Sequence, residues 1–321
     1  MKIAFLSFPE QSELLISELK NRFGISQKPD KCYGELLYYE NLELNKNQAG
    51  DFELPYWART VMLEPFFLEY KSISDAANSL KAIQRNWAPY QFTLFRKAEL
   101  IQKKLPYINL KERNFPCEIP SSEIGLYTLI DESHLIASAK TNSYLPAGAL
   151  IFKEDHENPP SRAYLKIQES LVIAKLLNGT PFPDSSVSCF EAGACPGGWT
   201  WVLTNLGARV FAVDRSELDS KLMKNPLVKF LAHDAFTLKP QDVENELGKV
   251  DWVFSDVICY PERLLEWIKT WLDYKKDIKM ICTIKMQGEI NWPLIDEFKN
   301  ISGSRIVHLN YNKHELTWIH T

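Results

Sequence analysis

The sequence predicts an α/β fold in which a smaller α+β region precedes a mostly parallel sheet of seven strands. Three observations lead to this prediction. Short apolar segments alternate with helical stretches after residue 160. A glycine-rich turn at 193–198 joins one of these strands to a helix. The last two expected strands are separated only by a short turn at 311–313, so they must run antiparallel.

The composition is that of a globular chain in a reducing compartment. With 321 residues, 45% of them hydrophobic, the chain is long enough for two or three domains. No apolar run approaches the length of a membrane-spanning helix, and acidic residues follow the short apolar run 3–8, so we expect neither a membrane span nor a signal peptide. The cysteines form no C-x-x-C pair, and Cys189 and Cys282 lie in apolar strands. We therefore expect a cytoplasmic protein without a structural metal.

Residues 1–152 are predicted to form the smaller α+β region. The expected helices lie at 10–23 and 76–83, the second capped by Ser74 and Asp75. A loop is expected at 45–51, and the expected strands lie at 2–8, 33–42, 61–70, 127–130 and 134–139. The polar stretch 153–160 ends in two prolines, which places the start of the second domain, 153–321, at residue 153.

The segment 71–113 is basic in a chain whose net charge is -4. It carries nine Lys or Arg against three acids, and it includes an expected helix at 93–104. Aromatic residues are interleaved with these charges at Trp87, Tyr90, Phe92 and Phe95. Two interpretations stay open. The helix is a solvated face with core aromatics beside it, or the segment contacts an RNA backbone and stacks on bases.

The second domain is expected to alternate strands and helices. A helix at 161–177 ends at Asn178-Gly179. Further helices are expected at 261–272 and 291–300. The expected strands lie at 187–191, 210–214, 228–232, 251–255, 279–285, 304–310 and 315–320.

The glycine-rich turn indicates which kind of ligand the second domain binds. Its glycines allow a tight bend and a close approach of a ligand to the backbone. Cys195 stands where a dinucleotide-binding turn has its second glycine, and Pro196 has no N–H to donate, so a pyrophosphate is disfavoured. Asp214 ends the next strand, where a carboxylate can accept both hydroxyls of an adenosine ribose. The pattern favours S-adenosylmethionine, and its alternative is an ordinary β-turn without a ligand.

Charged residues end the neighbouring strands of the same sheet. These residues are Asp214, Asp234, Asp256 and Lys285. Ligands of open α/β sheets bind beyond the carboxyl ends of the strands, where Asp234 can accept from an adenine amino group. A single strand-end Asp is often only a turn or a helix cap. Four such residues at one edge favour a binding site.

Together these motifs resemble those of the FtsJ-like RNA ribose 2'-O-methyltransferases. The resemblance covers about residues 120–321, and it is carried by Ser161-Arg162-Ala163-Tyr164-Leu165-Lys166, Gly193-Ala194-Cys195-Pro196-Gly197-Gly198-Trp199-Thr200, Asp214, Asp256, Lys285 and His314-Glu315. It implies a Rossmann-like seven-stranded methyltransferase sheet with a terminal antiparallel hairpin, S-adenosylmethionine as cofactor, and RNA as substrate, large-subunit rRNA in particular. It further implies that residues 1–152 are a ferredoxin-like and THUMP-like region that binds RNA.

The resemblance also implies the roles of single residues. The family's catalytic tetrad corresponds to Lys166, Asp256, Lys285 and Glu315. Its cofactor contacts correspond to Ser161, Gly193, Cys195, Pro196, Gly197, Gly198, Trp199, Asp214, Asp234 and Asp256. One departure is Glu191, which stands where the family usually has Asp; Glu can face the methionine end of the cofactor, but with a different reach. His314 is expected to be a surface or turn residue.

Methyl transfer to a ribose hydroxyl needs a group that takes the hydroxyl proton. A free Lys has a pKa of about 10.4. Burial, the sulfonium and Lys166 are expected to lower the pKa of Lys285, whereas Asp256 and Glu315 raise it and hold the side chain in place. The alternative is that Lys285 only orients the hydroxyl. Two rival functions stay open as well: a methyltransferase for a protein or small molecule, and an RNA-binding module without catalysis.

Overall fold

The computed structural model describes residues 1–42 and 54–321, so the loop expected at 45–51 lies outside the described residues. The chain forms two compact units. The first unit comprises Met1–Arg113 and Ile119–Ile151, and the second comprises Asn114–Glu118 and Phe152–Thr321. The main division lies one residue before the position that the sequence indicated, and residues 114–118 group with the second unit.

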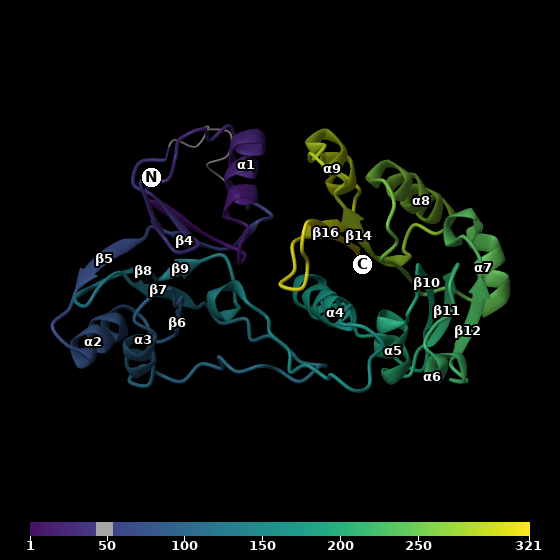
Figure 1. Cartoon of the computed structure of the whole chain (residues 1–321), viewed down its shortest axis with the longest axis horizontal. Coiled ribbons are helices and arrows are strands. Elements are labelled where there is room, and N and C mark those ends of the chain that lie inside the picture. The colour runs from purple at the N-terminus through teal and green to yellow at the C-terminus, as the bar shows by residue number, and fades with distance from the viewer. Residues whose placement is uncertain (43–53) are drawn as a thin grey trace. The chain divides into compact units, whose positions relative to one another are not determined.

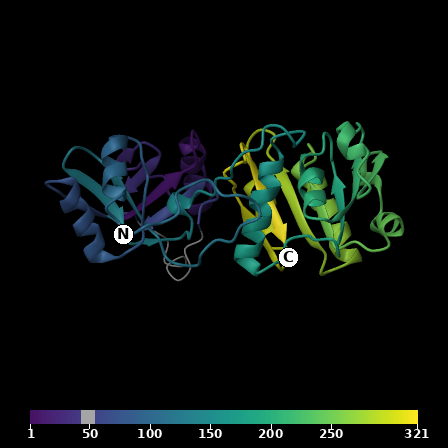
Figure 2. The same cartoon turned by 90° about the horizontal axis from the view of Figure 1, so that it is seen from below.

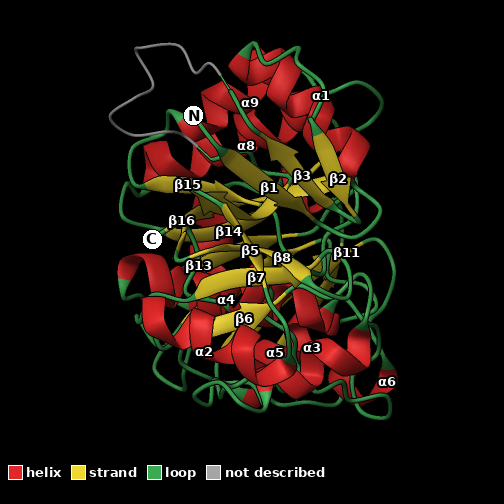
Figure 3. Cartoon of the chain, turned by 90° about the vertical axis from the view of Figure 1, so that its left-hand side faces the viewer, coloured by secondary structure: helices red, strands yellow, loops and turns green. Residues whose placement is uncertain are grey.

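The first unit contains a five-stranded antiparallel sheet of order β2-β3-β1-β4-β9. Its strands are β1 (Ile3–Ser7), β2 (Lys31–Tyr33), β3 (Leu36–Tyr39), β4 (Ala58–Leu63) and β9 (Lys140–Thr141), and helix α1 spans Ser12–Phe23. The neighbouring strands β1, β3 and β2 can be followed in Figure 3. The single strand expected at 33–42 is wrong. The chain reverses at Gly34, whose φ of 61° is readily adopted by glycine, so β2 and β3 form a hairpin.

A second sheet of the first unit has the order β5-β8-β7-β6, with β6 parallel to β7 and the other pairs antiparallel. Its elements are β5 (Phe66–Glu69), α2 (Ile73–Ile83), β6 (Trp87–Pro89), α3 (Phe95–Gln102), β7 (Gly125–Leu129), β8 (His134–Ser138) and the short helix η2 (Pro146–Gly148). The strand expected at 61–70 is two strands in two sheets. Pro65, which has no N–H for a ladder, stands between them. The N-cap of α2 is Ser72, whose hydroxyl accepts from the amide of Asp75, rather than Ser74.

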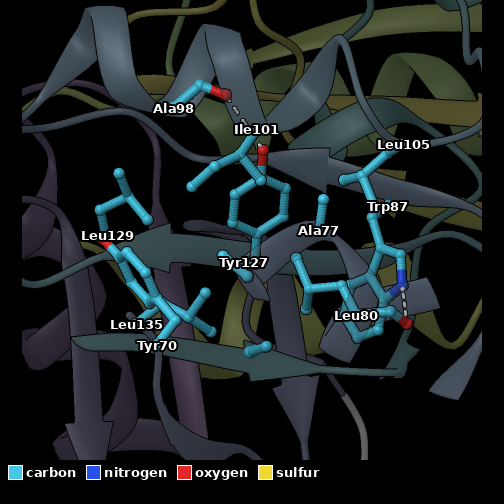
Figure 4. Packing of buried hydrophobic residues seen from close by; sticks show 12 residues of the cluster. Tyr70, Ala77, Leu80, Trp87, Ala98, Ile101, Leu105, Tyr127, Leu129 and Leu135 are labelled. Carbon is cyan, nitrogen blue, oxygen red and sulfur yellow. Dashed lines mark hydrogen bonds between the residues drawn. The ribbon is translucent and has the colours of Figure 1, made fainter. Parts of the chain in front are cut away.

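Helices α2 and α3 cover one face of this sheet and form a core with it (Figure 4). The indole of Trp87 donates to the carbonyl of Leu80 at 2.9 Å, and the hydroxyl of Tyr127 donates to the carbonyl of Ala98 at 3.4 Å. Trp87 is therefore a core residue and does not stack on bases. Tyr90 is buried as well, whereas Phe95 is exposed.

The second unit is a doubly wound α/β domain of order β12-β11-β10-β13-β14-β16-β15. Its strands are β10 (Ser188–Ala192), β11 (Arg209–Asp214), β12 (Val228–Ala232), β13 (Trp252–Ser255), β14 (Lys279–Lys285), β15 (Ser304–Val307) and β16 (Glu315–His320). Its helices are α4 (Tyr164–Asn178), α5 (Gly198–Asn205), α6 (Ser220–Met223), η3 (Ala235–Thr237), α7 (Pro240–Leu247), α8 (Pro261–Tyr274) and α9 (Trp292–Lys299). The mixed α/β fold with a mostly parallel sheet is thus confirmed. Strand β15 ends at residue 307 instead of 310.

The strand pairing of this sheet determines where the site lies. Strands β10 to β14 are parallel, and β16 runs antiparallel to both β14 and β15. Strand β16, yellow in Figure 2, lies beside β14. Helices α4 and α5 cover one face, and α7, α8 and α9 cover the other (Figure 1). Both faces are therefore covered, which explains why every residue of β10 and β13 is buried, and why Cys189 on β10 and Cys282 on β14 are fully buried.

The order of the strands reverses at β10, which pairs with β11 on one side and β13 on the other. Such a switch point leaves a crevice beyond the carboxyl ends of the two central strands. Among the helices of residues 1–42 and 54–321, none has the length and apolar content that crossing a bilayer requires.

Candidate active site

Four charged side chains from four elements meet at the carboxyl edge of the second unit's sheet. Lys166 lies on α4, Asp256 follows β13, Lys285 ends β14 and Glu315 begins β16. The ammonium nitrogen of Lys166 lies 3.1 Å from Asp256 Oδ1 and 2.6 Å from Glu315 Oε1. The ammonium nitrogen of Lys285 lies 3.2 Å from Asp256 Oδ1. The structure thus brings together all four residues that the sequence singled out for chemistry.

Lys166 is the central cation of this cluster. Its side chain is only 8% exposed and lies between the carboxylates of Asp256 and Glu315. Burial by itself lowers the pKa of Lys166, but the two carboxylates outweigh burial and raise the pKa above its usual value. Lys166 therefore stays charged, and its contacts suit a residue that holds the two acids in place rather than one that accepts a proton.

Lys285 has fewer acidic neighbours than the sequence suggested. Its ammonium group donates to the main-chain carbonyl of Asp256 at 2.7 Å and contacts the Asp256 carboxylate. Glu315 lies opposite Lys285 in the β14–β16 register, yet its carboxylate pairs with Lys166. The lysine flanked by two acids is therefore Lys166. Lys285 is the more exposed of the two lysines, at 20% of its side chain.

Two residues near the cluster, His314 and Glu169, differ in burial and in hydrogen bonding. His314 is exposed in the turn before β16, as expected for a turn residue. Glu169, one turn after Lys166 on α4, is buried and accepts from the amides of Asn310 and Tyr311 at 3.0 and 3.2 Å. Burial raises the pKa of Glu169 to about 7, although these hydrogen bonds oppose the rise. Glu169 thereby holds the loop that leads into Glu315.

The glycine-rich turn passes directly between β10 and α5. Gly193 has a φ of 77°, and a Cβ at this position would lie 2.5 Å from the Val257 side chain. Gly197 has a φ of 110° and precedes the first turn of α5. Side chains at either position would collide or strain the backbone, so the turn can stay close to the loop after β13. The first N–H groups of α5 have no partner within the helix, so they suit a carboxylate such as that of a methionine moiety.

Asp214 links the end of β11 to this turn. Its carboxylate accepts from the amide of Cys195 at 3.0 Å and from the amide of Ser216 at 3.0 Å. Ser161, before α4, approaches the turn from the other side, because a Cβ on Gly198 would lie 2.6 Å from its hydroxyl oxygen. That hydroxyl is buried and has no hydrogen-bond partner among the residues the structure describes. The unpaired hydroxyl of Ser161 and the carboxylate of Asp214 therefore both lie near the glycine turn. These groups fit a ligand that carries hydroxyl and amino acid groups.

Trp199 and Asp234, two more of the expected cofactor residues, also have side chains engaged with the protein. Trp199 is buried, and its indole donates to the carbonyl of Ala163 at 3.0 Å, which packs α5 on the start of α4. Asp234 pairs with Arg215 at 2.7 Å and with Arg263 at 3.2 Å. Burial opposes a low pKa at Asp234, but the hydrogen bonds from its neighbours, that from Arg215 first, lower it.

Glu191 does not lie open at the turn. Its carboxylate is buried and accepts from the Thr200 hydroxyl at 2.6 Å. Burial raises the pKa of Glu191 to about 8, against the effect of this hydrogen bond. The longer side chain at this position thus links β10 to α5 inside the domain.

Sequence reasoning missed an exposed apolar loop beside the cluster. Ile258 and Tyr260 follow Asp256 directly and are 79% and 66% exposed. Tyr260 also lines a small cavity of about 80 Å³ together with Met286 and Gln287, which follow Lys285. The sequence could have indicated this loop, because an apolar run lies between Asp256 and Pro261, the first residue of the next helix. Loop residues at this edge of a sheet are usually polar.

Comparisons with known proteins agree with this geometry. A sheet that switches at β10, a bare glycine turn and a strand-end Asp place the second unit in the class of α/β domains that bind an adenosine-containing ligand at a switch point. Within that class, residues 159–299 match the model of the FtsJ-like methyltransferases. Glu315 lies beyond the matched residues, and it is the fold that places it in the cluster.

Curated relatives carry the name Ribosomal RNA large subunit methyltransferase M. The protein of Hahella chejuensis is 28% identical over 214 residues, which are 63% of this chain and 48% of the relative. The protein of Halorhodospira halophila is 32% identical over 142 residues, 44% of this chain and 39% of the relative. The chain spans about half the length of the curated relatives it matches, or less.

Solved structures show weaker likeness. The Methanococcus jannaschii fibrillarin pre-rRNA processing protein matches with a TM-score of 0.37 and 20% identity, covering 48% of this chain and 73% of that one. TrmN from Thermus thermophilus matches with a TM-score of 0.35 and 11% identity, covering 100% of this chain and 99% of that one. Likeness at this level supports no inference about function. Across residues 1–42 and 54–321, the structure contains no group of His, Cys, Asp and Glu arranged to hold a metal ion.

Proposed function

We propose that the protein transfers a methyl group from S-adenosylmethionine to a ribose 2'-hydroxyl of RNA, and that its substrate is large-subunit rRNA. The observation that carries the proposal is the joined cluster of Lys166, Asp256, Lys285 and Glu315 at the switch-point edge of an FtsJ-like domain. The names of the curated relatives support the choice of rRNA. A cytoplasmic location belongs to the same proposal, because rRNA is the substrate.

The cofactor residues proposed are Ser161, Gly193, Cys195, Pro196, Gly197, Gly198, Trp199, Asp214, Asp234 and Asp256. When bound, S-adenosylmethionine supplies an electrophilic methyl group. Asp214 suits the ribose hydroxyls, and the buried hydroxyl of Ser161 suits the amino acid end. Trp199 contributes by its backbone and by packing α5, since its indole is already bonded to Ala163. Asp234 reaches an adenine amino group only by sharing its carboxylate with Arg215 and Arg263.

The division of labour among the four charged residues follows from their contacts. Lys166 neutralises Asp256 and Glu315 and so fixes both. Lys285 is held by Asp256 alone among the acids and is the more exposed lysine, so its nitrogen can meet a substrate hydroxyl. The role proposed for Lys285 is that of the general base that would accept the proton of this hydroxyl, while S-adenosylmethionine would supply the methyl group.

The exposed loop after Asp256 supports a nucleic-acid substrate. Ile258 and Tyr260 present apolar surface to solvent within a few residues of the reacting groups. Aromatic and aliphatic side chains in such positions stack on unpaired RNA bases, at about 1–3 kcal/mol per base for aromatic residues. Residues 1–152, which contain the first unit, are proposed as the ferredoxin-like and THUMP-like region that binds more distant parts of the RNA.

The test is methylation of deproteinised large-subunit rRNA with labelled S-adenosylmethionine, followed by nucleoside analysis. We expect the label in 2'-O-methylribose, where it protects the adjacent phosphodiester bond from alkali. Label in a base would show that the enzyme methylates a base and not the ribose 2'-hydroxyl. Label in added protein or small molecules, with none in RNA, would favour the rival methyltransferase. Binding of RNA without binding of S-adenosylmethionine would favour a non-catalytic module.

A further inference from the structure

The first unit contains a cavity of about 580 Å³. Its lining includes none of the residues proposed for catalysis or for cofactor binding. Its walls come from β4, from the residues after β6, from the end of the basic segment 71–113 and from η2. Ligand pockets in proteins typically measure about 300–1,000 Å³. The cavity is therefore larger than a bare phosphate requires and is suited to a nucleotide.

Arg59 on β4 is the charged group at the wall of this cavity. Its Nε atom is shielded from solvent and has no hydrogen-bond partner among the described residues. Nor does any described carboxylate lie within ion-pair distance of its guanidinium group. Burial lowers the pKa of Arg59, although the charge of Glu35 opposes this. A shielded N–H donor without an acceptor costs free energy, and a bound anion that accepts from it would offset that cost.

The backbone of Arg59 is held in place by close packing. A Cβ on Gly148 would lie 2.1 Å from the Arg59 carbonyl oxygen, and Gly148 has a φ of 71°. Glycine is required at this position for both reasons. The position of Arg59 is thus set by the fold before any ligand arrives, as a preorganised anion site needs.

Two further cations line the same cavity, Lys111 and Arg113 from the basic segment. Two acids, Glu35 and Glu99, line it as well, so the cations outnumber the acids. One oxygen of Glu35 is occupied by the hydroxyl of Tyr90, which donates to it at 2.7 Å. Three cations and two acids give the lining a net charge of +1, which matches the single negative charge of a phosphodiester.

We propose that this cavity binds one nucleotide of an RNA strand, with the phosphodiester against Arg59, Lys111 and Arg113. The planar guanidinium groups can each donate two hydrogen bonds to phosphate oxygens. Gln91 and the apolar Leu110 line the remaining space, where a ribose or base fits. The inference rests on the proposed function, because it takes its ligand from the RNA substrate.

The test compares three variants of the whole protein. Arg59→Gln removes the shielded charge, and the double variant Lys111→Ala with Arg113→Ala removes the outer charges without touching the strand. The control, Lys103→Ala with Lys104→Ala, removes the same charge from exposed positions of the same segment that do not line the cavity. Fluorescence anisotropy measures binding of a single-stranded oligoribonucleotide, and calorimetry measures binding of S-adenosylmethionine.

We expect both cavity variants to bind the oligonucleotide at least about tenfold more weakly, with a shallower salt dependence. The control should lose clearly less, and the affinity for S-adenosylmethionine should not change. A ribonucleoside monophosphate should compete at lower concentration than inorganic phosphate; equal competition would overturn the assignment of a nucleotide. If Arg59→Gln does not fold, the double variant alone decides.

The two proposals can fail separately. If the wild-type protein methylates RNA and the double variant has the same RNA affinity as the control, the cavity proposal is wrong and the proposed function stands. If the wild-type protein binds S-adenosylmethionine but neither binds nor methylates RNA, both are wrong.

Discussion

The ammonium nitrogen of Lys166 lies 2.6 Å from a carboxylate oxygen of Glu315, which joins helix α4 to the first residue of strand β16. Glu315 faces Lys285 in the sheet register, yet its charge is taken by Lys166. As a consequence, Asp256 is the acid that pairs with Lys285 among residues 1–42 and 54–321. The predictions below follow from this arrangement and from the residues around it.

Lys285→Ala is expected to lower the rate of methyl transfer by about 10²–10⁴-fold, the range for loss of a general acid or base. The affinity for S-adenosylmethionine should stay within about twofold. Radiolabel transfer and calorimetry measure the two effects. Lys279→Ala is the control, because Lys279 lies at the opposite end of the same strand. Near-normal turnover of the Lys285 variant would remove this residue from the mechanism.

Lys166→Met is expected to destabilise the protein by about 3 kcal/mol, because it leaves the largely buried carboxylate of Glu315 without its cation and removes one of the two cations that pair with Asp256. Adding Glu315→Gln should restore part of that loss, which a double-mutant cycle in urea would measure. Lys175→Met on the same helix removes an exposed ion pair with Glu118 and should cost less than about 1 kcal/mol. If the effects of Lys166→Met and Glu315→Gln on the free energy of unfolding were simply additive, the two side chains would not be coupled.

Asp214→Ala is expected to weaken binding of S-adenosylmethionine by at least about tenfold. The change removes a charged acceptor, and hydrogen bonds to charged groups contribute about 1.5–3 kcal/mol. It also releases the amide of Cys195 and so loosens the glycine turn. Calorimetry with the cofactor measures the effect, and Asp273→Ala on the exposed face of α8 is the control. Unchanged affinity would show that the ribose lies elsewhere.

Glu191→Gln is expected to change how stability depends on pH. The pKa of Glu191 is raised to about 8 in the fold from an ordinary 4.5, so the folded state holds a proton that the unfolded state has lost. The stability from this group is full below about pH 4.5 and falls as pH rises towards 8, by about 1.4 kcal/mol per unit. Denaturation at pH 5, 6.5 and 8 should show this slope in the wild type relative to the variant. Parallel curves would mean that Glu191 is ionised in the fold.

Tyr260→Ala is expected to raise KM for RNA about tenfold or more while leaving cofactor affinity unchanged, because a stacked base contributes about 1–3 kcal/mol. Tyr260→Phe keeps the ring and should restore most of the affinity. Tyr274→Ala, at the other end of α8, serves as the control. An equal KM in the alanine variant would show that the loop does not contact the substrate.

Much of the second unit could be predicted because its signals are local. Apolar segments between turn residues placed strands at 228–232, 279–285 and 315–320, as the structure has them. The first unit was harder. The hairpin at Gly34 and the break at Pro65 interrupt apolar runs that look continuous, and β6 lies inside the basic segment 71–113, where no strand was expected.

By itself, the sequence determined which residues end the parallel strands, and therefore that Asp214, Asp256 and Lys285 share one edge. The tertiary structure decided how those charges pair: which lysine Glu315 neutralises, that Asp234 is held by two arginines, and that the Nε atom of Arg59 meets no acceptor among the described residues. The physical reason is range. Strand direction follows from the local pattern of apolar residues and turns, whereas an ion pair depends on side chains that meet only when distant segments pack together.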